Sequence, residues 1–197
     1  MQRIETSLPG VIELRPVIHR DARGFFTETY HQAKFADHGI TDTFLQDNHS
    51  RSVKGTLRGL HYQLRRPQAK LCRVVEGEAL DVAIDIRLGS PSFGKWTSVL
   101  LSAEQQNQIY VPVGFAHGYL ALSDSVQFLY KCSDFYDPAD EHGIAWNDPD
   151  LANRLAVGAV AASGIQAFFD QGADIAPSIV DSGVDFAAEE KDHRLSV

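Results

Sequence analysis

The chain between Leu71 and Tyr136 consists of short apolar runs separated by glycine and proline, and this pattern limits its fold more than any other feature. The runs are rich in β-branched and aromatic residues, as is typical of strands. Many short strands with little helix favour an antiparallel sandwich or jelly roll. The runs cover residues 71–75, 79–87, 96–101, 108–122 and 126–136, and the fourth is broken at Pro112.

The N-terminal part also alternates apolar and polar residues. Residues 11–18 predict an early strand, and Pro16 places it at a sheet edge or near a bulge. Residues 25–30 predict a second strand. Residues 32–38 predict a short helix that ends at Gly39, since glycine often follows the last helical residue.

Two further local predictions concern the middle of the chain. The polar stretch 45–52, LQDNHSRS, is typical of a loop. The pair Glu76-Gly77 predicts a turn that joins 71–75 and 79–87 as a hairpin. In the second strand of that hairpin, Asp81 and Asp85 lie on one face.

The composition excludes some classes of function. The net charge of −8 and pI near 5.4 argue against nucleic-acid or anionic-membrane binding, because the long-range field repels polyanions. Cys72 and Cys132 are too few for a disulfide scaffold, and both lie in apolar runs. No signal sequence or membrane-spanning run stands out, so we expect a cytoplasmic protein. We expect one domain over residues 1–197, with 151–197 as a divergent C-terminal segment.

The stretch 55–70, GTLRGLHYQLRRPQAK, places positive charge around one imidazole in an otherwise acidic chain. An imidazole beside cations can remove a proton next to a ketone and leave an enolate paired with a cation. We therefore interpret His61 as a general base, with Arg58 and Lys70 holding negative charge. A tyrosine across the cavity would return a proton to the opposite face and invert the carbon centre.

The same stretch resembles the cupin metal motif. Gly55 and His61 match G-x5-H, and Pro112 to His117 match P-x-G-x-x-H. Gln63 stands where the second histidine is expected, and the expected glutamate is missing, with Lys70 among the residues there. Because an ammonium group competes with a divalent ion, we expect no metal and no other cofactor.

Several motifs in one order resemble the dTDP-4-dehydrorhamnose 3,5-epimerase family of the cupin superfamily, over roughly residues 1–150. The resemblance implies an all-β fold, a cupin-type antiparallel jelly roll with short peripheral helices, and an isomerase that epimerises a nucleotide-linked sugar. The matching motifs are RGFFTE (23–28), QDNHS (46–50), LRGLHYQ (57–63), QAK (68–70), DIRLGSPSFGKW (85–96), PVGFAHG (112–118) and YKCSDFYDPADEHGI (130–144).

The resemblance implies a role for each matching residue. His61 would abstract the protons at C3 and C5 of a 4-keto sugar, Tyr130 would be the acid on the other face, and Lys70 would polarise the keto oxygen. Family members pair as homodimers through exchanged N-terminal strands. The residues implied to bind the nucleotide sugar are Arg23, Glu28, Gln46, Asn48, Arg58, His117, Glu141 and Lys191.

Some assignments have competitors. The family orients its catalytic histidine with an aspartate in a sequence like S-E-K-D, which Asp192 matches best, whereas an ungapped count leads to Asp170. Tyr136 competes with Tyr130 as the acid. His117 either contacts the ligand or only holds its loop. Alternative functions are a metal-dependent cupin enzyme and a non-catalytic nucleotide-sugar binding module.

Overall fold

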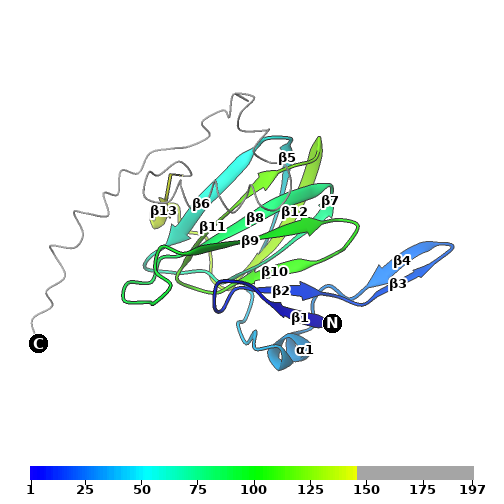
Figure 1. Ribbon diagram of the computed structural model, residues 1–197, viewed down its shortest axis with the longest axis horizontal. Helices are drawn as coiled ribbons and strands as arrows, with labels where there is room; N and C mark the ends of the chain where they lie inside the picture. Colours follow the sequence, from blue (N-terminus) through cyan, green and yellow to red (C-terminus); the bar gives the residue numbers. More distant parts are fainter. Residues whose placement is uncertain (146–197) are drawn as a thin grey trace, which may run out of the picture.

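The computed structural model describes residues 1–145 of the chain, which form a sandwich of two antiparallel sheets (Figure 1). This arrangement confirms the expected antiparallel jelly roll. One sheet contains, in spatial order, β1 (Gln2–Glu5), β2 (Ile12–Arg15), β10 (Gln108–Val111), β7 (Lys70–Glu76), β12 (Ser125–Cys132) and β5 (Gln46–Val53). The other contains β13 (Glu141–Gly143), β6 (Leu57–Gln63), β11 (Phe115–Ala121), β8 (Glu78–Asp85) and β9 (Trp96–Ser102).

The N-terminal elements follow the sequence pattern closely. Strand β2 ends just before Pro16, and the chain continues into a separate hairpin of β3 (Ile18–Asp21) and β4 (Gly24–Thr27). Figure 1 shows this hairpin projecting from the body of the molecule. The predicted short helix is α1 (Gln32–Asp37), and Gly39 beyond it has a φ of 86°, which suits glycine.

The prediction of a loop at residues 45–52 is wrong, because most of this stretch is β5. The strand pairs with β12 along its whole length, from Gln46 opposite Cys132 to Val53 opposite Ser125. It is an edge strand whose outward residues are polar except Val53, and its inward residues face the interior of the sandwich. A polar cavity rather than an apolar core explains why the inward positions are also polar.

The predicted hairpin across Glu76-Gly77 is also wrong. Strand β7 pairs with β10 and β12, whereas β8 pairs with β11 and β9 in the other sheet. The chain therefore crosses between the two sheets at Gly77, which has a φ of 77°. A Cβ at this position would lie 2.3 Å from the carbonyl oxygen of Ser125, so only glycine fits the crossing.

The apolar core lies between the two sheets and ends at a cavity. Buried residues of the core include Val74, Leu101 and Ile109. At its boundary, the rings of Tyr119 and Phe128 stack with centroids 4.0 Å apart. Both rings also line the cavity, so the core supports one wall of it. Within residues 1–145, no helix is long and apolar enough to cross a membrane.

Candidate active site

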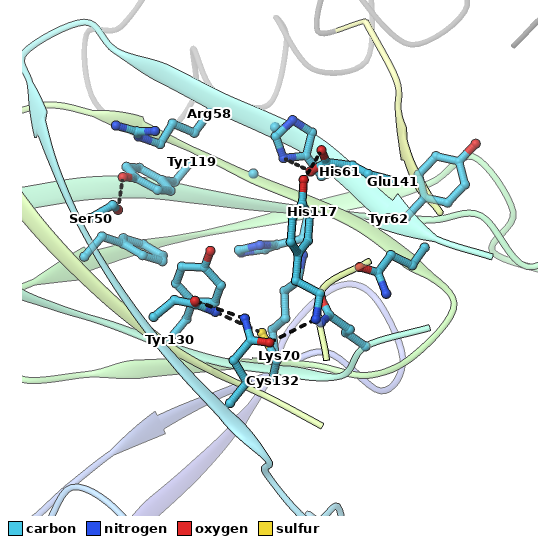
Figure 2. A pocket seen from close by; sticks show the side chains of 18 residues that line it. Ser50, Arg58, His61, Tyr62, Lys70, His117, Tyr119, Tyr130, Cys132 and Glu141 are labelled. Carbon is cyan, nitrogen blue, oxygen red and sulfur yellow. Dashed lines mark hydrogen bonds and ion pairs between the residues drawn. The ribbon is translucent and has the colours of Figure 1, made fainter. Parts of the chain in front are cut away.

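A cavity of about 350 Å³ lies between the sheets, and both sheets contribute side chains to it (Figure 2). Its predicted members come from β5, β6, β7, β11, β12 and β13, elements that are distant in sequence. The jelly roll therefore gathers most of the predicted site residues in one place. The predicted residues that line the cavity are Gln46, Asn48, Arg58, His61, Lys70, His117, Tyr130 and Glu141.

Two glycines bring β6 and β11 unusually close at the cavity. A Cβ at Gly118 would lie 2.4 Å from the carbonyl oxygen of Arg58, and one at Gly59 would lie 2.5 Å from the Cα of Gly118. The pairing has a register irregularity here, between His117 and Tyr119. His117 stands directly opposite His61, and both line the cavity. The close approach thus places two imidazoles side by side.

His61 has the properties of a base. Its side chain is 42% exposed, and its Nδ1 lies 3.5 Å from Oε1 of Glu141. Burial lowers the pKa of His61; Glu141 opposes this shift, whereas the positive charges of Lys70 and Arg58 add to it. The imidazole is therefore mostly neutral at pH 7 and can accept a proton.

Tyr130 has the properties of an acid and belongs to the sheet opposite His61. Burial raises the pKa of Tyr130 to about 12, so its hydroxyl keeps its proton at neutral pH. The competing acid, Tyr136, also lines the cavity, but it is 50% exposed and its hydroxyl donates to Oε2 of Glu141 at 2.8 Å.

His117 is held by a buried carboxylate that the sequence did not identify as part of the site. The Nε2 of His117 lies 2.9 Å and 3.0 Å from the two carboxylate oxygens of Asp81, which is fully buried. Burial raises the pKa of Asp81, and His117 and Lys70 oppose the shift. A buried aspartate in an apolar strand requires a hydrogen-bonding partner. This requirement was the sequence feature that could have identified Asp81 as part of the site. His117 therefore both lines the cavity and anchors Asp81.

Hydroxyl groups that the sequence analysis did not select fix the Arg58 side of the cavity. Arg58 Nε donates to Ser52 Oγ at 3.0 Å. The hydroxyl of Tyr119 lies 2.9 Å from that of Ser50 and 3.0 Å from that of Ser52. These contacts hold the guanidinium at the cavity, where it can meet an anion.

The predicted amides on β5 are also hydrogen-bonded. Gln46 Nε2 donates to Asn48 Oδ1 at 3.1 Å, and Gln46 Oε1 accepts from the backbone N–H of Tyr136 at 2.9 Å. Asn48 Nδ2 donates to the sulfur of Cys132 at 3.6 Å. The β5 strand is thus tied to the segment that carries Tyr136.

The cupin metal positions do not form a metal site in this chain. Gln63 uses its side-chain amide to bind backbone: Nε2 donates to the carbonyl oxygen of Arg66 at 2.7 Å, and Oε1 accepts from the N–H of Asp137 at 3.0 Å. Lys70 adds a positive charge to the same cavity. The donor set of the motif therefore does not suit a divalent cation.

A separate cluster of Cys72, Asp81 and His117 is the one group of three metal-type donors found in the described part of the chain. It is fully buried, and Asp81 already binds His117 through both oxygens. Burial raises the pKa of the Cys72 thiol well above its usual value, so the sulfur stays protonated. Within the described residues, this cluster is a hydrogen-bonded Asp81–His117 pair beside a protonated thiol.

Among the described residues, two predicted ones do not line the cavity. Arg23 lies between β3 and β4 in the hairpin, and its side chain is 90% exposed. Glu28 follows β4, and its carboxylate accepts a hydrogen bond from Lys34 at 2.8 Å. Lys191 and Asp192 lie outside the described residues, as does the alternative partner Asp170.

A jelly roll whose cavity holds a neutral histidine and a protonated tyrosine on facing sheets has the architecture of a cupin-type enzyme. The sequence matches the family model described as dTDP-4-dehydrorhamnose 3,5-epimerase over residues 5–167. The chain belongs to this family of isomerases, as the resemblance implied.

Named relatives and solved structures agree with the family model. A dTDP-4-dehydrorhamnose 3,5-epimerase of Pseudomonas aeruginosa is 50% identical over 77% of this chain and 84% of the relative. A longer relative of the same name from Neisseria gonorrhoeae is 50% identical, and the match covers 77% of this chain and 46% of that protein. A Legionella pneumophila epimerase, solved with dTDP-4-keto-L-rhamnose, is 49% identical with a TM-score of 0.75 over 77% of this chain and 81% of that structure.

Proposed function

We propose that this chain inverts C3 and C5 of a dTDP-linked 4-keto-6-deoxyhexose without a metal or organic cofactor. The observation that carries the proposal is the placement of His61 and Tyr130 on opposite sheets of one cavity, which Lys70 also lines. A sugar ring bound there presents one face to the base and the other to the acid. Inversion requires this geometry, because the proton must leave from one face and return to the other.

The proposed reaction proceeds in two proton transfers at each carbon. Neutral His61 takes the proton from the carbon beside the ketone, and the bonding electrons move to the carbonyl oxygen to give an enolate. The ammonium of Lys70 stabilises that oxygen. Tyr130 then donates its hydroxyl proton to the opposite face of the carbon, and the carbonyl forms again. His61 releases its proton and Tyr130 regains one through solvent, which restores both groups.

The remaining cavity residues suit the nucleotide part of the substrate. Arg58, held by Ser52, is the cation best placed to meet a diphosphate, since a guanidinium binds phosphate oxygens in pairs. The Legionella relative, with its bound dTDP-sugar, supports the choice of ligand class.

The test is proton NMR of a dTDP-4-keto-6-deoxyglucose sample in heavy water. We expect the wild-type chain to incorporate deuterium at C3 and C5, and His61→Asn to abolish the incorporation. His49→Asn is the matched control, because His49 is an exposed residue of β5 that does not line the cavity. Unchanged incorporation in His61→Asn would refute the mechanism, and tight binding without exchange in the wild type would favour a binding module.

We also propose that the active form is a homodimer in which the β3–β4 hairpin of one copy completes the cavity of the other. The hairpin projects from the body (Figure 1), and Phe25 and Phe26 on it are 53% and 70% exposed. The hairpin carries Arg23, and Glu28 follows it directly. These two predicted ligands do not line the cavity of their own chain, and both are placed on or beside the projecting hairpin. A cytoplasmic location stays a prediction.

Subunit complementation tests this arrangement. The Arg23→Ala and His61→Asn proteins are mixed under conditions that exchange subunits. If Arg23 acts in the partner's cavity, a mixed dimer has one complete site. With half of the dimers mixed, activity should recover to roughly a quarter of wild type. Recovery no greater than the sum of the two separate proteins would contradict the exchange.

A further inference from the structure

We infer that Asp140 is a positioning residue for the cavity wall that carries Tyr136 and Glu141, an inference that rests on the proposed function. This wall is the segment between β12 and β13, residues 133–140, and it contains no helix or strand. Tyr136 lies in its middle, Glu141 follows it directly, and both line the cavity. Because no strand pairing fixes the segment, side chains must hold its backbone in place.

Asp140 binds the wall to the loop after β6. It is 1% exposed, and its two carboxylate oxygens accept hydrogen bonds from the backbone N–H of Arg65 at 3.1 Å and 3.0 Å. Its Oδ2 also accepts from the backbone N–H of Arg66 at 2.9 Å, and its Oδ1 accepts from Nε of Arg65 at 3.2 Å. Burial raises the pKa of Asp140, but these hydrogen bonds outweigh burial and lower it, so the group is charged at neutral pH.

Gln63 closes the same set of contacts from β6. Its Nε2 donates to the carbonyl oxygen of Arg66 at 2.7 Å, and its Oε1 accepts from the N–H of Asp137 at 3.0 Å. Gln63 therefore reaches from the strand to both the loop and the wall, and Asp140 reaches from the wall to the loop. Together they set the position of the wall relative to β6.

The other contacts of the wall are neutral or exposed. Gln68 Nε2 donates to the carbonyl oxygen of Asp134 at 2.8 Å, which is a bond between neutral groups. Arg66 pairs with Asp134, but these side chains are 44% and 30% exposed, and water weakens such a pair. Within residues 133–140, all of which the structure describes, Asp140 is the one buried carboxylate. Its charged hydrogen bonds should therefore contribute most to holding the wall.

The proposed proton transfers use side chains from other elements. His61 is on β6, Lys70 is on β7 and Tyr130 is on β12, and strand pairing fixes all three. A displaced wall should therefore weaken the hold on the substrate more than it slows proton transfer in the bound complex. Such a change raises KM and leaves kcat nearly constant.

The first experiment compares Asp140→Ala with wild type in steady-state kinetics on dTDP-4-keto-6-deoxyglucose. The substitution leaves two backbone N–H groups of the loop without their acceptor. We expect KM to rise roughly tenfold and kcat to change less than about threefold. Asp140→Asn keeps one acceptor oxygen and should raise KM less. Asp124→Asn is the matched control, because Asp124 is exposed and does not line the cavity, and it should change neither constant.

The second experiment reads the wall directly in the substrate-free protein. Fluorine-19 NMR of protein labelled with 3-fluorotyrosine gives a resonance for Tyr136, which Tyr136→Phe identifies. In Asp140→Ala this resonance should shift or broaden, whereas that of the buried Tyr110 should not. Arg65→Ala removes one side-chain donor but keeps the backbone N–H that binds Asp140, so it should shift the Tyr136 resonance less.

Two results would overturn the inference. One is an Asp140→Ala protein that is less stable in urea but keeps the wild-type KM and Tyr136 resonance, which would make Asp140 a residue of the fold only. The other is a reduced kcat with an unchanged KM. If Asp140→Ala does not fold, Asp140→Asn takes its place in both experiments. If the wild-type chain fails to exchange substrate protons, the proposed function fails, whereas the fluorine resonance still decides whether Asp140 positions the wall.

Discussion

Replacing Tyr130 with phenylalanine should separate proton removal from inversion. The ring packs beside Phe128 with centroids 6.1 Å apart, and phenylalanine preserves that packing. In the described residues the Tyr130 hydroxyl makes no hydrogen bond to protein, so its loss should cost at most about 1 kcal/mol of stability. At a pKa of about 12, roughly one hydroxyl in 10⁵ is ionised at pH 7. The wild-type residue is therefore almost always a proton donor.

The expected result follows from the two-sheet geometry. His61 still removes and returns protons on its own face, so Tyr130→Phe should continue to incorporate deuterium from solvent. Formation of inverted product should fall by roughly 10²- to 10³-fold, the usual contribution of a positioned acid. The assay follows deuterium incorporation and product configuration by NMR in one sample. If Tyr130→Phe inverts normally and Tyr136→Phe does not, the acid has been assigned to the wrong tyrosine.

Three other measurements test the site and its frame. Burial lowers the pKa of His61 from its usual 6.5, so its neutral form persists to lower pH. The acid limb of the pH profile of kcat/KM should therefore lie below pH 6.5. An acid limb above that value would contradict the burial argument. Lys70→Met should reduce kcat/KM by roughly 10²- to 10³-fold, because the enolate loses its stabilising cation. Lys54→Met, which changes an exposed lysine, should leave kcat/KM unchanged. Equal losses in the two variants would show that Lys70 does not stabilise the enolate oxygen. Gly118→Ala should lower the free energy of unfolding by about 1–3 kcal/mol, because its Cβ would lie 2.4 Å from the carbonyl oxygen of Arg58. Urea denaturation measures this change. An unchanged urea midpoint would show that β6 and β11 separate easily to admit the methyl group.

The pattern of apolar runs, together with the glycine and proline residues between them, was sufficient to predict the strands of the central region. Strands β10 and β11 fall on either side of the break at Pro112–Gly114, as the sequence indicates. The two errors have different physical origins. Gly77 looks like a hairpin turn, but it allows a close crossing between sheets. Residues 46–53 look like a loop because their inward side chains face a polar cavity.

The candidate site was predictable where a residue type carries its own chemistry. His61, Lys70 and Tyr130 belong to recognisable motifs, and they meet in the cavity. Asp81 was not assigned to the site, since its importance comes from a partner 36 residues away in the chain. The contact of Glu141 with His61 was not predicted, because it depends on the register of a three-residue strand.

Gln63 has a consequence for how such a site could change. Its amide joins the loop after β6, through Arg66, to the segment before β13, through Phe135 and Asp137. A histidine introduced there to restore the cupin metal ligand would release these backbone groups and loosen the wall that carries Tyr136 and Glu141. Metal chemistry and proton-transfer chemistry thus compete for one position, and a single substitution cannot convert either site into the other.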